Sequence, residues 1–243
     1  MGKIKVKRKS TLIDMTAMSD VTVLLLTFFM LTSTFLQKEP TTVITPPSVS
    51  ETKVQVANVA QILVGTDPEG KEAKVYLSLT GEADPDLSKW ATDSLRMEVF
   101  ANAVRRYQSL SNKQIFTPGE VGLYAQKFAK IGSFGVPFSE LKAWLDMKQD
   151  EQDHFIGDMS NPKSGIPLEA DKKGVNEFQV WMSAIRETSN DNLREAIRKT
   201  GNGIAVKADQ NTPFNLVNEV LDNLRSLKLN KFTVMTALKT END

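Results

Sequence analysis

The chain of 243 residues contains no cysteine and a single histidine, His154. Without cysteine it has no disulfide framework, no thiol nucleophile and no zinc site built on thiolates. His154 stands among Asp150, Asp153 and Asp158, a setting more typical of a solvated surface than of a metal site. No phosphate-binding loop, Ser-His-Asp arrangement or other nucleophile–base pair stands out. We therefore predict that the protein is not an enzyme and holds neither a metal nor a cofactor.

An excess of one charge is also lacking, because 30 Lys and Arg balance 30 Asp and Glu. Five of the basic and two of the acidic residues precede residue 38, so residues 38–243 keep 25 basic and 28 acidic residues. A mildly acidic surface is not that of a nucleic-acid-binding protein, and we predict no nucleic-acid partner. The early basic residues form an N-terminal group without acids, namely Lys3, Lys5, Lys7, Arg8 and Lys9.

Long apolar stretches are scarce, and the only one, from Leu12 to Leu36, has Asp20 inside it. The uncharged part, Val21–Leu36, has 16 residues, which as a helix is about 24 Å long against roughly 30 Å of hydrocarbon core. A membrane span must therefore begin before Asp20, so we predict a transmembrane helix over residues 12–37 with this acid embedded in the lipid bilayer. An ionised aspartate at a helix centre costs roughly 2.5 to 3.5 kcal/mol, and a group retained at such a cost usually has a function. Asp20 is our candidate proton carrier.

Two simpler interpretations of these residues remain open. Ser19 and Asp20 can cap the start of a short helix at the membrane interface, where a carboxylate favours the positive helix end. Three threonines lie close to the helical stripe of Asp20 and are candidates for a polar, pore-facing surface, namely Thr16, Thr27 and Thr34. Their hydroxyl groups can instead bond backbone carbonyls of the preceding turn.

The basic tail, residues 1–11, predicts a cytoplasmic N-terminus by the positive-inside rule. No small-x-small cleavage site follows the apolar run, so we expect an uncleaved signal anchor that spans the membrane once. Everything after the span then lies on the opposite side of the membrane.

Residues 38–55 are rich in proline and hydroxyl side chains and predict an extended linker. A hairpin is expected next, because alternating apolar residues around 62–64 and 75–79 flank the turn sequence Asp67-Pro-Glu-Gly70. Near the C-terminus, residues 204–208 and 232–234 alternate as strands, with a helical period between them. Residues 82–200 are mostly helical in period, and we interpret their aromatic side chains as core. The predicted fold is α+β: a small domain, 56–243, with a helix on one face of its sheet and a large, mostly helical insertion.

Two segments carry distinctive motifs. The first, Asp14-Met-Thr-Ala-Met-Ser-Asp20 followed by a Leu-rich span, is similar to the signature of the ExbD/TolR family, although Ala17 stands where that family usually has proline. The second, Ala205-Val-Lys-Ala-Asp-Gln-Asn-Thr-Pro-Phe214 with its following helix and strand, is similar to the second half of the family's periplasmic domain. The resemblance covers roughly residues 10–80 and 203–238 and leaves the helical middle outside.

The resemblance implies a subunit that transduces the proton motive force in the inner membrane. Such spans form a homodimer within a ring of ExbB-like subunits, Asp20 would take up and release protons, and a TonB-like partner would carry the work to the outer membrane. The domain would be periplasmic, and protons would be the only coupling ion. An ExbD-type role is favoured over a TolR-like role in envelope maintenance. A structural anchored interaction protein, or an enzyme with its site in the helical insertion, are the other interpretations.

Overall fold

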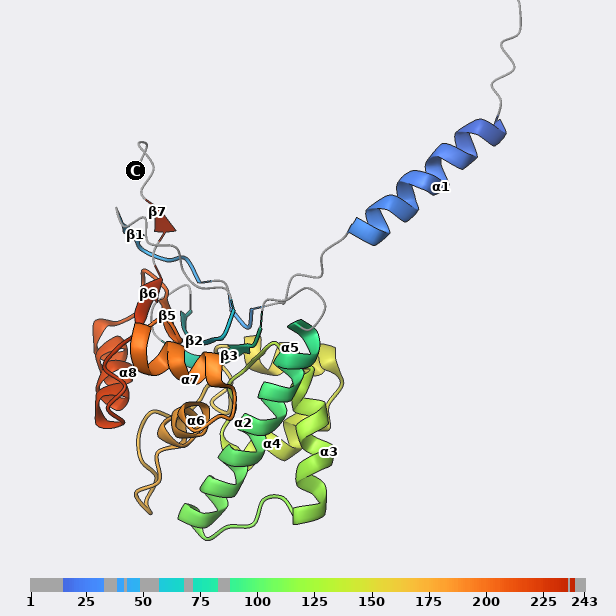
Figure 1. Cartoon of the computed structure of the whole chain (residues 1–243). Coiled ribbons are helices and arrows are strands. Elements are labelled where there is room, and N and C mark those ends of the chain that lie inside the picture. The colour runs from blue at the N-terminus through green and yellow to red at the C-terminus, as the bar shows by residue number, and fades with distance from the viewer. Residues whose placement is uncertain are drawn as a thin grey trace, which may run out of the picture. The chain divides into compact units, whose positions relative to one another are not determined.

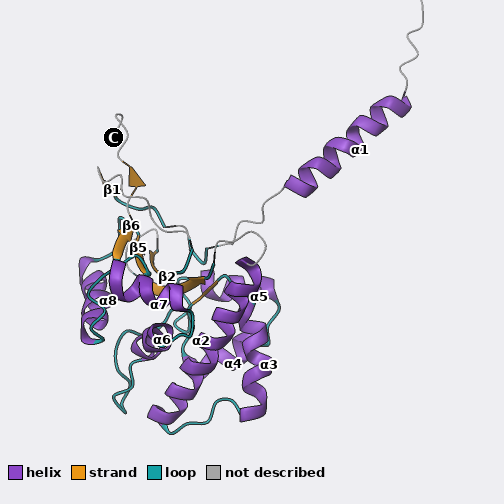
Figure 2. Ribbon diagram, viewed as in Figure 1, coloured by secondary structure: helices purple, strands orange, loops and turns teal. Residues whose placement is uncertain are grey.

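The computed structural model describes residues 15–32, 39–41, 43–48, 57–67, 72–82, 88–235 and 237–238. These fall into two compact units, residues 1–37 and residues 38–243. The first unit contributes one helix, α1 (Met15–Thr32). The second combines helices with a mixed sheet, which confirms the predicted α+β class (Figure 1 and Figure 2).

The sheet of the second unit has five strands in the order β4-β3-β2-β5-β6. The strands are β2 (Val59–Thr66), β3 (Ala73–Thr80), β4 (Ser133–Phe134), β5 (Ile204–Ala208) and β6 (Thr233–Met235). β2 and β3 pair antiparallel with Ile62 opposite Leu77, which confirms the predicted hairpin. β5 and β6 are parallel neighbours, joined by α8 (Phe214–Ser226), so the predicted strand-helix-strand unit is confirmed as well.

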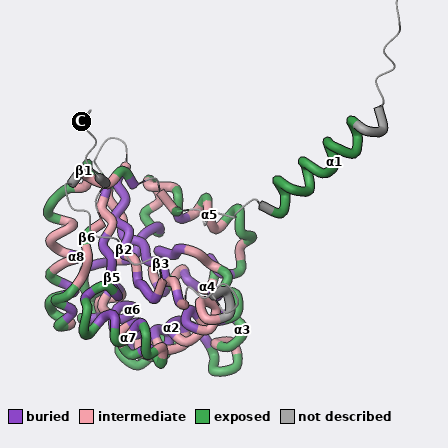
Figure 3. The backbone as a smooth tube through the Cα atoms, turned by 45° about the horizontal axis from the view of Figure 1, so that its top comes forward, coloured by how far each residue is buried: buried purple, intermediate pink, exposed green. Residues whose placement is uncertain are grey.

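Both faces of the central hairpin are covered. Ile62 and Leu63 are adjacent in β2, so their side chains point to opposite faces, and both are buried. The chain between β3 and β5 therefore adds cover to the small sheet beside the helix that the sequence predicts (Figure 3).

The segment between β3 and β5 is helical, as predicted. Its helices are α2 (Ser88–Ser111), α3 (Pro118–Ala129), α4 (Phe138–Leu145), α5 (Gln149–Gly157), α6 (Glu177–Arg186), α7 (Asp191–Glu195) and the π-helical turn η1 (Ala196–Thr200). The backbone N–H of Thr117 donates to the Glu120 carboxylate at 2.9 Å, which gives α3 the expected capping contact. α2 packs along α3 and α6 and reaches β3, while α8 lies beside α6 (Figure 1).

The aromatic side chains of this segment form its core, as predicted. Trp181 of α6 is fully buried and stacks between Phe128 and Phe138, with ring centroids 5.6 and 5.0 Å away. Tyr107 of α2 stacks in turn on Phe138 at 4.3 Å. Stacked and tilted aromatic pairs contribute beyond the area that they bury, so this cluster joins α2, α3, α4 and α6 into one unit.

One buried cation ties that unit to the sheet. Arg96 of α2 is 3% exposed, and its guanidinium donates from Nε and Nη2 to the carbonyl of Leu79 at 3.0 and 2.8 Å. Its Nη1 donates to the carbonyl of Ala129 at 3.1 Å. Leu79 lies in β3 just beyond the residues that pair with β4, and Ala129 ends α3. Arg96 therefore donates to carbonyl groups that are not hydrogen-bonded within their own strand or helix.

Candidate functional site

The helix α1 carries one ionisable residue, Asp20, in an otherwise uncharged sequence of 18 residues. The residues of α1 from Met18 to Leu31 are exposed, as Figure 3 shows. The exposed fraction of Leu31 reaches 86%. A helix of this kind has no polar face to turn toward water. Among the residues that the structure describes, no helix combines the length and the apolar character needed to cross a membrane.

The predicted site residues of α1 can be placed in part. Asp20 is exposed, one turn and a half after the helix begins. Thr27 Oγ1 donates to the carbonyl of Leu24 at 3.0 Å, which is the backbone bond of the alternative interpretation, made three residues back. Thr16 belongs to α1, but its side chain lies outside the described residues, as does all of Thr34. A polar face formed by these threonines stays a prediction.

The chain that follows the first unit is attached to the domain beside β5. Glu39 pairs with Lys207 at 2.6 Å, and Val43 is buried. The backbone N–H of Ile44 donates to the carboxylate of Asp209 at 2.8 Å. Gln210 returns a bond to the carbonyl of Ile44 at the same distance. This part of the predicted linker is thus held at the carboxyl end of β5.

A short parallel pairing continues this attachment. β1 (Pro47–Ser48) pairs with β7 (Ala237–Leu238) near the C-terminus. Residues 42 and 49–56 lie outside the described residues, so the linker boundaries 38–55 remain a prediction. The chain that directly follows the α1 unit is therefore bonded to two segments that are distant in sequence, the end of β5 and β7. A force applied to this chain would be transmitted to β5 first.

The surroundings of His154 form a hollow of about 610 Å³ on α5. Asp150, Asp153, Asp158 and Pro40 share its wall. Within the described ranges, no group of three carboxylate or imidazole side chains is placed to hold a metal ion.

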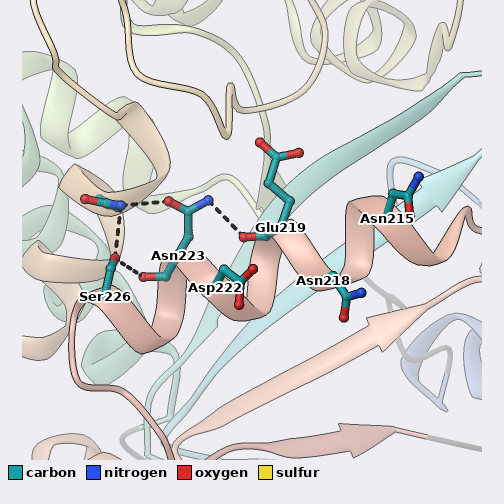
Figure 4. A pocket seen from close by; sticks show the side chains of 7 residues that line it. Asn215, Asn218, Glu219, Asp222, Asn223 and Ser226 are labelled. Carbon is teal, nitrogen blue, oxygen red and sulfur yellow. Dashed lines mark hydrogen bonds between the residues drawn. The ribbon is translucent and has the colours of Figure 1, made fainter.

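A second hollow, of about 400 Å³, lies on α8 and is lined by amide and acidic side chains (Figure 4). Its inner wall is the buried Asn223, whose Oδ1 accepts from Gln179 at 2.7 Å and from Asn176 at 2.8 Å. Asn223 also donates to the carbonyl of Glu219 at 2.9 Å. These bonds occupy the side-chain amide of Asn223, so Asn223, Gln179 and Asn176 hold α8 against α6. The role of this group is structural.

One partly buried carboxyl group in the domain has a pKa that is raised toward neutral pH. Glu177, the first residue of α6, accepts a bond from the backbone N–H of Phe138 at 2.8 Å. Burial disfavours its charged form and raises its pKa to about 6, and nearby Asp171 adds to the shift. This residue was not predicted, because nothing local distinguishes it from other acidic residues at helix starts.

Glu177→Gln is expected to stabilise the domain at pH 7.5 by up to about 2 kcal/mol. A carboxyl with a raised folded-state pKa binds its proton more tightly when folded, so its effect favours folding below about pH 4.5 and is lost as the pH rises through about 6. Glutamine keeps an oxygen that accepts from Phe138 and removes the titration. Urea unfolding from pH 4.5 to 7.5 measures the difference, with Glu72→Gln as an exposed control. A difference between variant and wild type that does not change with pH would contradict this.

The described parts of the chain define an α+β domain preceded by an apolar helix with a single acidic side chain. A family model described as biopolymer transport protein ExbD/TolR matches residues 6–144. This match spans more than half of the 243 residues, so the chain belongs to the ExbD/TolR family. Neither the curated proteins nor the solved structures gave a match.

The match confirms the predicted family but not the predicted extent of the resemblance. It includes Asp20 and the hairpin and continues through α2 and α3 into α4, so part of the helical middle lies within it. It does not include residues 203–238, where the second resemblance was predicted. As a member, the chain is an energy-transducing protein of biopolymer transport. The family is typically anchored in a membrane and works with partners of ExbB/TolQ and TonB/TolA type.

Proposed function

We propose that this chain is the ExbD-type subunit of an inner-membrane motor that uses the proton motive force to energise TonB-dependent transport across the outer membrane. The observation that carries the proposal is Asp20, the one ionisable residue of an apolar helix in a chain of this family. A buried carboxyl group that exchanges a proton changes its charge, and an apolar surrounding makes that change costly enough to drive a movement.

In this proposal residues 12–37 span the membrane once, with the N-terminus in the cytoplasm and the domain in the periplasm. The exposed apolar side chains of α1 would face lipid and ExbB-like ring subunits, and two copies of the chain would form a homodimer within the ring. Asp20 would take up a proton from one side and release it to the other, and protons would be the only coupling ion. The chain is not an enzyme in this account.

The force would leave the membrane through residues 39–46. Glu39 and Ile44 are bound to Lys207 and Asp209 at the end of β5, so a displacement of the span would be transmitted to the sheet. A TonB-like partner would receive it from the domain. The features of the domain that favour this role are a firm attachment and a rigid core, rather than a cavity for a substrate.

Deletion of the gene tests the role in the cell. The expected result is a loss of receptor-dependent uptake through the outer membrane, with uptake of small solutes through porins unchanged as the control. The physical reason is that only the receptor-dependent step needs energy from the inner membrane. Radiolabelled substrate uptake measures both. Normal receptor-dependent uptake together with sensitivity to detergent would assign the TolR-like role instead, and the absence of both defects would contradict a motor.

A further inference from the structure

A pocket with only basic charges lies between the end of α6, the turn η1 and the loop that follows α8. Its volume is about 330 Å³, and the cations on its wall are Arg186, Arg198, Lys228 and Lys231. Its floor includes Ile197 and Leu229, each 5% exposed. Among the described residues, no carboxylate lines it. This is unusual in a domain with more acidic than basic residues.

Two of the four cations are fixed by the backbone. Arg186 Nη1 donates to the carbonyl of Leu227 at 2.9 Å, and Lys231 Nζ donates to the carbonyl of Lys199 at 2.9 Å. These bonds join α6 and η1 to the loop after α8 and hold the wall in shape. Carbonyl groups do not neutralise a charge, but Arg186 also forms an ion pair with Glu187, from Nη2 to Oε1 at 3.4 Å. The positive potential of the pocket therefore comes mainly from Arg198, Lys228 and Lys231.

The other two cations, Arg198 and Lys228, are exposed and make no ion pair within the part of the chain that the structure describes. Lys228 has a left-handed backbone with φ of 59°. It follows the last turn of α8, where its N–H bonds the carbonyl of Arg225 and that of Leu229 bonds the carbonyl of Leu224. Glycine is the favoured residue at such a position, and a lysine there is strained.

We propose that this basic pocket binds an acidic segment of a partner protein, with carboxylates on its cationic rim and an aliphatic side chain on its floor. The inference rests on the proposed function, in which the domain passes force to a partner. Charge complementarity gives the sign of the segment. A phosphate is a weaker fit, because two of the four cations already donate to backbone carbonyl groups.

The surroundings favour a polypeptide over a small molecule. The loop that forms the pocket leads into β6, which is an edge strand of the five-stranded sheet that the structure describes. An extended segment seated in the pocket can therefore continue beside a sheet edge, which is a common way for peptides to bind. The exposed Val234 of β6 lies on that path.

The test uses the full chain in detergent and two labelled peptides, Glu-Val-Glu-Leu-Glu and its reverse-charge form Lys-Val-Lys-Leu-Lys, followed by fluorescence anisotropy. The acidic peptide is expected to bind and the basic one not. Combining Arg198→Gln with Lys228→Gln is expected to weaken binding roughly tenfold. The matched control combines Arg105→Gln with Lys172→Gln, exposed cations far from the pocket in sequence, and should bind as the wild type does.

Lys228→Gly separates binding from folding. Glycine relieves the left-handed backbone, so the melting temperature should stay the same or rise while affinity for the acidic peptide falls. Equal binding of both peptides, or binding that the double variant leaves intact, overturns the proposal. Binding of anionic lipid vesicles that is stronger than peptide binding and lost in the double variant also overturns it, since the pocket would then serve a headgroup. If the pocket does not bind the acidic peptide but uptake still depends on Asp20, the pocket proposal fails and the proposed motor function is retained.

Discussion

Asp20→Asn is expected to reduce energy-dependent uptake to background while the subunit still assembles with its membrane partners. Asparagine has nearly the size and hydrogen-bonding reach of aspartate, but it cannot exchange a proton. If Asp20 carries the coupling proton, the variant loses the charge change on which the movement depends. Uptake of a receptor substrate and co-purification of the partner ring measure the two properties separately.

Two further variants complete the Asp20 experiment. Asp20→Glu keeps a titratable group and should retain part of the uptake. Asp14→Asn removes the other carboxylate of the predicted span, which lies at its cytoplasmic edge, and should leave uptake near the wild-type rate. Full uptake by the Asn variant at position 20 would refute the proton-carrier role. Equal losses at positions 14 and 20 would show that local negative charge, rather than titration at one site, is what matters.

The attachment of residues 39–46 connects the movement predicted at Asp20 to the sheet of the domain. Ile44 and Asp209 are 165 positions apart in the sequence, yet they are joined at 2.8 Å. The ion pair between Glu39 and Lys207 lies alongside. In the proposed motor, a movement that begins at Asp20 would pass through the chain that follows α1, and that chain is tied to the end of β5 before it reaches the hairpin. Firm attachment at this point would let a small displacement act on the whole sheet.

The sequence predicted the parts of the fold that have local causes. The hairpin followed from alternating residues around a turn, and α8 followed from its apolar period, because neighbours in sequence are neighbours in space there. α4 and α5 lie in the segment predicted to be helical but were not predicted as separate helices, although Phe138, Leu141 and Trp144 are buried on one face of α4. A helix of eight residues offers barely two turns of period, and β4, with two residues, offers none.

The contacts that hold the domain together were not predictable in this way. The proline-rich composition of residues 38–55 predicted a linker, and nothing in it showed that Ile44 would meet Asp209. The position of Arg96 in the sequence does indicate that it is buried, because it lies four residues before Phe100, on the apolar stripe of α2. A charged residue at a buried position must find partners, but the identity of those partners depends on the fold of β3 and α3.

Arg96→Met is expected to lower the free energy of unfolding of the domain by about 2 to 4 kcal/mol. Methionine fills much of the same volume and avoids the cost of burying a cation, but it leaves the carbonyl groups of Leu79 and Ala129 without these donors. Each buried acceptor left unpaired costs about 1 to 3 kcal/mol. The loss should appear in urea unfolding followed by tryptophan fluorescence, because Trp181 lies in the core that Arg96 joins to the sheet.

Arg105→Met is the matched control, since Arg105 lies on the exposed side of the same helix. It should change the free energy of unfolding by less than about 0.5 kcal/mol. If the variant at position 96 is as stable as this control, the two carbonyl groups have other donors and Arg96 is not the tie between insertion and sheet. If it is destabilised but unfolds in two steps, the helical insertion separates from the sheet before the sheet itself unfolds. A single cooperative transition at lower urea is the expected result, because the aromatic core and the hairpin share one buried cluster.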